Sequence, residues 1–144
     1  MTDAYPVALS KGIAQWLDDQ QFGLYRSAGQ YLPADDKASL PPITRTGRPP
    51  LALMNVISLR TGQPIIDGPD QITPVMIFIR LKAGADALDA LTDRLRRSLG
   101  ALRHVAFGDI PIGLVEYRNG LTFEQDAQQR ESANLTFHFR GRRP

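Results

Sequence analysis

The chain contains no cysteine, and its 144 residues include only two histidines and three lysines. Without cysteine it has no disulfide bond and no thiolate metal site. His104 and His138 could bind zinc only with the help of carboxylates, and we expect both to be surface or capping residues. No apolar run reaches the roughly 20 residues that cross a membrane, and residues 1–6 lack the pattern of a signal peptide. We therefore expect no membrane partner, metal or cofactor.

The overall composition is that of an ordinary globular protein, with 42% hydrophobic and 22% charged residues. The net charge of +2 is too small to indicate nucleic-acid binding by itself. Most of the basic residues are arginine, which suits fixed, bidentate contacts and so weakly favours interfaces. The length predicts a single domain over residues 1–140.

Residues 72–102 predict one strand followed by one helix. Alternate positions from Val75 to Leu81 are apolar, and Met76 and Phe78 make the middle of the other face apolar too. A strand of this kind belongs at the centre of a sheet, covered on both sides. After Gly84 the spacing becomes that of an amphipathic helix, with leucines at 88, 91, 95, 99 and 102.

The other elements follow from similar periodicities and from turn residues. Trp16 is expected to anchor the core, with ligand stacking as the alternative. Asn119-Gly120 is typical of a two-residue hairpin between two strands. We predict a helix at 7–17, strands at 22–25, 51–60, 105–107, 114–118, 121–125 and 132–140, and irregular segments at 65–71 and 109–113. Together these predict an α+β fold in which an antiparallel or mixed sheet has two main helices packed on one face.

Residues 32–50 predict a long proline-rich loop that carries Arg45 and Arg48. Loops of this length within a domain often have a function. Two interpretations remain open: a solvated surface loop, or an arm that becomes ordered on a partner. Residues 141–144 predict a basic tail that leaves the domain.

A search for catalytic residues finds no phosphate-binding loop and no marked nucleophile. The acid pairs Asp18-Asp19 and Asp35-Asp36 are expected to be solvated loop charges. The arginines near the C-terminus could contact either a neighbouring subunit's carboxylates or phosphate. We therefore expect a protein that is not an enzyme.

Three segments resemble the tail terminator proteins of long-tailed bacteriophages, also called minor capsid or tail completion proteins. They are Ile-Phe-Ile-Arg-Leu-Lys-Ala-Gly at 77–84 before the leucine-rich helix, Asp-Ala-Gln-Gln-Arg at 126–130, and Ser-Ala-Asn-Leu-Thr-Phe at 132–137. The first helix, the proline-rich loop and the strand at 51–60 come in the family's order, so the similarity covers nearly the whole chain.

The resemblance implies a structural protein of the virion, located at the head–tail interface after assembly in the host cytoplasm. Such proteins form a hexameric ring that caps the head-proximal end of the tail tube and stops its polymerisation. The implied partners are further copies of the chain, the major tail tube protein and the head completion or connector protein, with DNA near the channel. The candidate interface residues are Arg45, Arg48, Asp126, Arg130, Arg140, Arg142 and Arg143.

Two other function classes stay open. The C-terminal arginines and a pI of about 9.2 are compatible with a small nucleic-acid-binding accessory domain, although no recognition motif or aromatic platform accompanies them. An enzyme whose site forms between subunits is a weaker alternative. Because none of the candidate residues from Asp126 onward belongs to the predicted core, their substitution is expected to cost little stability.

Overall fold

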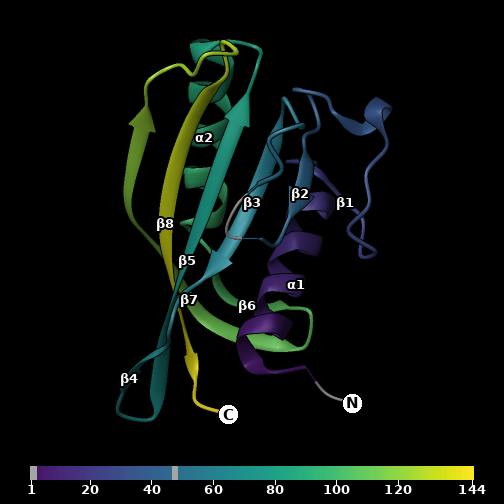
Figure 1. Cartoon of the computed structure of the whole chain (residues 1–144). Helices are drawn as coiled ribbons and strands as arrows, with labels where there is room; N and C mark the ends of the chain where they lie inside the picture. Colours follow the sequence, from purple (N-terminus) through teal and green to yellow (C-terminus); the bar gives the residue numbers. More distant parts are fainter. Residues whose placement is uncertain (1–2, 47–48) are drawn as a thin grey trace.

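The computed structural model describes residues 3–46 and 49–144, which form a curved eight-stranded sheet and two α-helices (Figure 1). Strands β1, β2 and β3 pair in parallel, and all the other pairs are antiparallel. The strand order is β1-β2-β3-β5-β8-β7-β6, with β4 pairing with one end of β5. The elements are α1 (Tyr5–Asp19), β1 (Leu24–Tyr25), the 3-10 helix η1 (Pro33–Asp35), β2 (Pro42–Thr44), β3 (Val56–Thr61), β4 (Ile65–Asp67), β5 (Asp70–Leu81), α2 (Ala85–Leu99), β6 (Arg103–Phe107), β7 (Ile110–Phe123) and β8 (Glu131–Arg142). The predicted α+β fold is confirmed.

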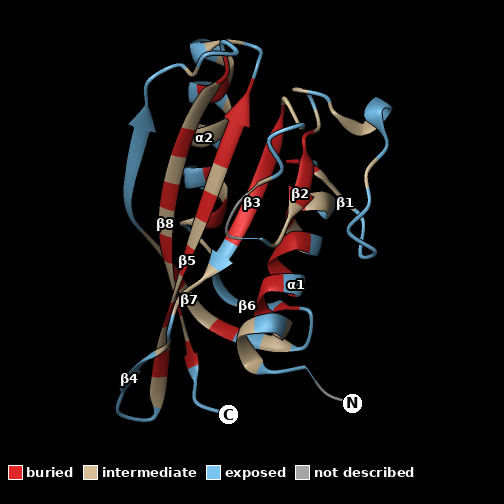
Figure 2. Cartoon of the chain, viewed as in Figure 1, coloured by how far each residue is buried: buried red, intermediate tan, exposed pale blue. Residues whose placement is uncertain are grey.

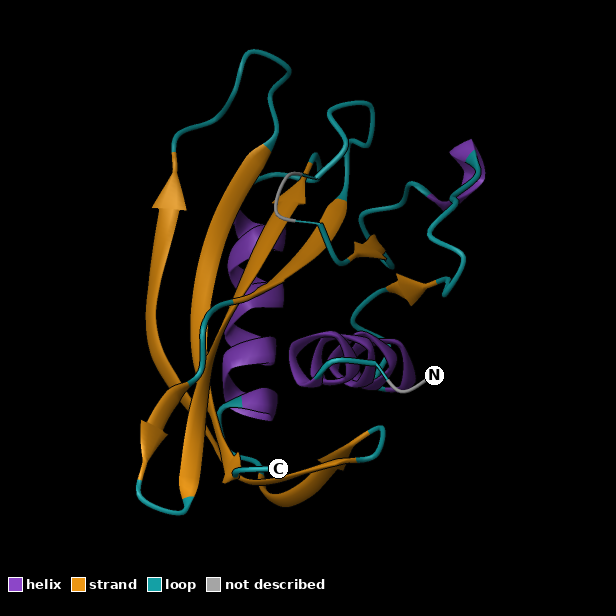
Figure 3. Ribbon diagram, turned by 60° about the horizontal axis from the view of Figure 1, so that its bottom comes forward, coloured by secondary structure: helices purple, strands orange, loops and turns teal. Residues whose placement is uncertain are grey.

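Strand β5 is central, between β3 and β8, as its apolar sequence predicts. Val75, Ile77 and Ile79 are fully buried on the face that both helices cover. Met76 and Phe78, on the opposite face, are only half-buried. The prediction that β5 is covered on both sides is therefore wrong for most of its length, because both helices lie on the same face of the sheet (Figure 3).

The core lies between this sheet face and the two helices (Figure 2). Helix α2 contributes the predicted leucine stripe, in which Leu88, Leu95 and Leu99 are buried. Helix α1 brings Trp16 within 5.8 Å of Phe22, measured between ring centroids, and within 6.2 Å of Phe107. Trp16 thus packs against the core as predicted.

Strand β7 corrects two predictions. It runs without interruption from Ile110 to Phe123, so residues 109–113 are not irregular and Asn119-Gly120 is not a hairpin turn. Asn119 and Gly120 pair with β8, next to a register shift after Tyr117. The bulge accommodates the Asn-Gly dipeptide within the strand. The turn that precedes β7 is at Gly108, which has φ +60°.

The segment before β3 corrects two more predictions. Residues 32–50 are not entirely loop, since they hold η1 and β2, whose Ile43 is fully buried. The strand predicted at 51–60 begins only at Val56, and Leu51 is 76% exposed. Residues 49–55 instead run outside the strands, and their carbonyl oxygens accept side-chain hydrogen bonds described below.

The sheet extends past the helices as a projecting hairpin, where a loop was predicted at 65–71. Ile65–Asp67 forms β4, which pairs with the first residues of β5 around the turn at Gly68 and Pro69. Strand β8 continues beside it to Arg142, so the first two residues of the predicted basic tail belong to the sheet. Figure 1 shows this hairpin below α2, and we call residues 65–72 the arm.

Candidate functional site

Asp126 and Arg130 form an ion pair in the turn between β7 and β8. The Arg130 Nε donates to Asp126 Oδ2 at 2.6 Å, and Asp126 Oδ1 accepts the backbone N–H groups of Arg130 and Gln128 at 2.9 Å. These hydrogen bonds, first that from the Arg130 backbone, lower the pKa of Asp126. The Arg130 side chain is only 6% exposed. The expectation that Arg130 lies outside the core is therefore wrong, because its side chain is buried.

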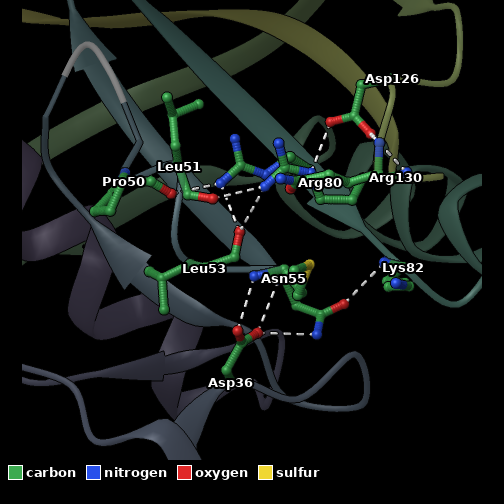
Figure 4. Close-up of polar contacts among 11 residues, drawn as sticks. Asp36, Pro50, Leu51, Leu53, Asn55, Arg80, Lys82, Asp126 and Arg130 are labelled. Atoms are coloured by element: carbon green, nitrogen blue, oxygen red, sulfur yellow. Dashed lines mark hydrogen bonds and ion pairs between the residues drawn. The ribbon is translucent and has the colours of Figure 1, made fainter.

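The guanidinium of Arg130 lies beside that of Arg80, and both donate to the chain that precedes β3 (Figure 4). Arg130 Nη1 donates to the carbonyl oxygens of Leu51 at 2.8 Å and Leu53 at 3.2 Å. Arg80 Nη2 donates to Pro50 O at 2.6 Å and Leu53 O at 2.7 Å. Burial, followed by the charge of Arg130, lowers the pKa of Arg80. The two arginines thus fix residues 50–53 against the end of the sheet.

Asp36 fixes the next two residues of the same segment. Its carboxylate accepts the backbone N–H groups of Met54 at 2.7 Å and Asn55 at 2.8 Å, and also the Asn55 side-chain amide at 3.0 Å. The Asn55 Oδ1 in turn accepts the N–H of Lys82 at 3.0 Å, which ties β3 to the end of β5. Asp36 is therefore not the solvated loop charge that the sequence predicts.

Two of the other three acids in the predicted solvated pairs, Asp35 and Asp18, are also engaged, whereas Asp19 is exposed as predicted. Asp35 accepts a fork of two hydrogen bonds from Arg26 at 3.1 and 3.2 Å, which is the main reason that its pKa is lowered. Asp18 accepts the N–H of Tyr25 at 2.8 Å and so joins α1 to β1. These acids order loops around the first strands of the sheet.

Arg140 lies at the opposite end of the sheet and binds the arm. It contacts Asp67 at 2.5 Å and Asp70 at 3.0 Å, one on each side of the arm's turn, and these hydrogen bonds, first that to Asp67, raise the pKa of Arg140. Arg142 is 82% exposed, and its Nε lies 4.0 Å from Asp70. The backbone N–H of Arg143 donates to Pro69 O at 3.0 Å.

The seven candidate residues therefore do not form one site. Asp126 and Arg130 lie at one end of the sheet, and Arg140 and Arg142 lie at the other, beside the arm. Arg45 is half-buried and Arg143 is exposed, and neither has an ion pair within the described residues. Arg48 lies outside the described residues. The sequence reasoning did not select Arg80, Asp36 or Asn55, although Arg80 interrupts an apolar strand and Asn55 is the one polar residue in an alternating stretch.

The sheet face opposite the helices carries a groove of about 570 Å³. We call it the open-face groove, and its lining includes Leu51, Arg60, Met76, Phe78, Phe123 and Asn134. Leu51 and Phe123 are 76% and 41% exposed, and nearby Leu121 is 61% exposed. The Phe78 and Phe123 rings lie 6.3 Å apart between centroids. Exposed apolar side chains gathered in this way are typical of an interaction surface.

Within residues 3–46 and 49–144, no group of three or more His, Cys, Asp or Glu side chains is placed to hold a metal ion. None of the helices described is long and apolar enough to cross a membrane.

Comparison with solved structures gives a weak likeness. No protein-family model matches the chain, and no curated protein matches it in sequence. The fold is similar to that of a chain in the solved structure "Virion of native gene transfer agent (GTA) particle". The TM-score is 0.49 and the identity 13%, over 68% of this chain and 76% of the other. A likeness of this degree assigns no function.

Proposed function

We propose that this chain is a non-enzymatic structural protein of a phage-like virion, a tail terminator. In this proposal it forms a hexameric ring that caps the head-proximal end of the tail tube and stops its polymerisation. The ring joins the tube to the head completion proteins, and its channel lies near DNA. The basis is the sequence resemblance described above, together with a fold that has its strands and helices in the order the resemblance implies.

The structural observation that carries the proposal is the placement of exposed apolar residues on two different parts of the subunit. Ile65 and Ile66 lie on the arm and are 52% and 56% exposed, while Leu121 and Phe123 lie at the far end of β7. A ring requires a heterologous interface, in which one surface of the subunit fits a different surface of its neighbour. Two separate apolar surfaces on one chain are suited to such an interface.

The nucleic-acid alternative is less well supported by the geometry. Arg140, one of the three C-terminal arginines on which it depends, is held by Asp67 and Asp70. Carboxylates that neutralise an arginine reduce its attraction for phosphate. This leaves Arg142 and Arg143 as the exposed basic residues of the patch.

The proposed function is tested by removing the gene from a strain that produces the particles and measuring tails in electron micrographs. We expect tails that exceed normal length or fail to join heads, with restoration by the wild-type gene. A DNA-binding titration of the purified protein at two salt concentrations tests the alternative, which predicts salt-dependent affinity. Tails of normal length joined to heads in the deletion strain would contradict the terminator proposal.

A further inference from the structure

The arm exposes a strand edge as well as apolar side chains. All three residues of β4 are exposed, and β4 pairs with β5 on one side only. On its other side no strand lies within the described part of the chain. Because the arm extends beyond both helices, neither α1 nor α2 covers it (Figure 1). Within the arm, β4 is thus accessible to another molecule along its outer backbone edge and through its exposed side chains.

The end of β7 exposes a second strand edge. Strand β6 pairs with β7 only as far as Leu114, and the next backbone contact on that side is from Val115 N–H to Leu102 O at 3.0 Å. Residues 118–123 are all exposed, and 119–123 pair with β8 on one side (Figure 2). On the other side they have no strand in the described structure. We call residues 118–123 the free edge.

The free edge has few of the features that prevent strand edges from pairing. Such edges are commonly blocked by proline, by lysine or by a bulge that twists them away. Residues 118–123 contain neither proline nor lysine, and the register shift lies at their beginning, between Tyr117 and Asn119. The segment instead carries the exposed side chains of Leu121 and Phe123.

The apolar residues of the arm and of the free edge lie on matching faces of the sheet. Leu121 pairs with Asn134, which pairs with Phe78 on the open face. Ile65 pairs with Ile72, which alternates with Phe78 along β5 and so lies on that same face. Suppose that the arm of one copy adds to the free edge of another, with the open faces of the two sheets on the same side. Ile65 of the first copy then lies beside Leu121 and the open-face groove of the second.

The charges at the two edges are also complementary. Asp67 of the arm remains 58% exposed although Arg140 binds it. The free edge begins with the exposed Arg118. In an antiparallel pairing with Ile65 beside Leu121, Asp67 lies opposite Asn119 and next to Arg118, and opposite charges this close on neighbouring strands favour pairing.

Given the proposed ring, we infer that its subunits are joined by strand pairing, with the arm of one copy lying along the free edge of β7 in the next. The occupant of the free edge and of the adjoining groove is thus a second copy of this chain. The arm and the free edge lie on opposite sides of β5 in the strand order and toward opposite ends of the sheet. The contact is therefore head-to-tail, as closure of a ring requires.

The absence of native cysteine allows this contact to be tested by disulfide cross-linking. The double variant Ile65→Cys with Leu121→Cys places one thiol on the arm and one on the free edge. Ile65 pairs with Ile72 of β5, whereas Leu121 is level with Phe78 of β5 through its own partner Asn134 on β8. Ile72 and Phe78 are six positions apart, which is about 20 Å along a strand. That separation is too great for a disulfide within one subunit, so any disulfide in this variant joins two copies.

The control variant combines Ile65→Cys with Leu32→Cys, since Leu32 is 66% exposed on a different part of the surface. We expect oxidation to give a ladder of covalent oligomers up to the ring from the first variant and mostly monomer from the control. Native mass spectrometry of both variants under reducing conditions records whether rings form. Rings that form without selective cross-linking between positions 65 and 121 would overturn the inference and leave the proposed function standing. If the purified protein stays monomeric up to its solubility limit, both the inferred strand pairing between copies and the formation of a ring by the purified protein are overturned.

Discussion

Replacement of Arg130 by alanine tests whether the buried arginine pair holds the segment before β3. In the native structure Arg130 donates to Leu51 O, Leu53 O and Asp126. The variant leaves Leu51 O without its side-chain donor, whereas Leu53 O keeps its hydrogen bond from Arg80. A hydrogen bond to a charged group contributes about 1.5–3 kcal/mol. The ion pair with Asp126 adds less, because the carboxylate of Asp126 is 36% exposed and solvent screens its charge.

The loss of Arg130 also removes a like charge from beside Arg80, which offsets part of the cost. We therefore expect Arg130→Ala to reduce the free energy of unfolding by about 2 kcal/mol. Urea unfolding monitored by circular dichroism measures this quantity. Thermal unfolding should show a midpoint lower by roughly 4–8 °C for a chain of this size.

Arg97→Ala is the matched control. Arg97 also pairs with an aspartate four residues away, at 2.6 Å from Asp93, but its side chain is 75% exposed. An exposed pair of this kind contributes little to stability, because solvent screens it. If Arg130→Ala and Arg97→Ala were equally stable, the conclusion that Arg130 supports the fold would be refuted.

The remaining predictions concern the core, the loop before β3 and acid stability. Leu95→Asp should abolish cooperative thermal unfolding, because it places an unpaired charge in the core. Arg96→Asp, on the exposed face of α2, should leave a folded protein. Similar melting curves for the two variants would contradict the orientation of α2. Asp36→Ala should lower the free energy of unfolding by about 1–3 kcal/mol, since the N–H groups of Met54 and Asn55 lose their acceptor, and an unchanged urea midpoint would refute this. The folded-state pKa of Asp126 is lowered, so its ionised carboxylate stabilises the fold above the unfolded-state pKa of about 3.9. This stabilisation is lost as the pH falls through the lower folded-state pKa. The free energy of unfolding of Asp126→Asn should therefore decline less on acidification than that of the wild type.

The parts of the fold that could be predicted are those fixed by local periodicity. Strand β5 is recognisable because its apolar residues are two positions apart, and helix α2 because its leucines are three or four positions apart. The change in spacing occurs at Gly84. The pairing of β3 with β5 follows from their proximity in the chain. In the last strand Phe137 and Phe139 are buried, as their alternation with the polar Thr136 and His138 predicts.

The errors arise where contacts between distant residues determine the backbone. Asn119-Gly120 has the sequence of a hairpin turn, but pairing along the whole of β8 keeps it within β7. Leu51 continues the alternation of β3 toward the N-terminus, yet its carbonyl oxygen binds Arg130, which is 79 positions away. Ile43 is buried because β2 pairs with β3. Strand β2 has only three residues and lies in a proline-rich stretch, so the sequence does not indicate it.

The candidate site was predictable only in part for the same reason. Asp126 and Arg130 are selected by the family resemblance, and the structure brings the two together. Arg80 stands out as a charged residue in an apolar strand, but its acceptors are 27 and 30 positions earlier, so no local pattern indicates what it binds. The proximity of Arg140 to Asp67 and Asp70 depends on the pairing of β5 with β8 and on the arm, which the sequence predicted as a loop.

Electron cryo-microscopy of the head–tail junction of intact particles tests the terminator proposal most directly. The terminator proposal predicts one six-fold layer of this chain at the head-proximal end of the tail tube. The inferred strand pairing predicts density that connects the arm of each copy to β7 of the next. A three-fold or twelve-fold layer of the chain, or a junction that does not contain it, would contradict the terminator proposal.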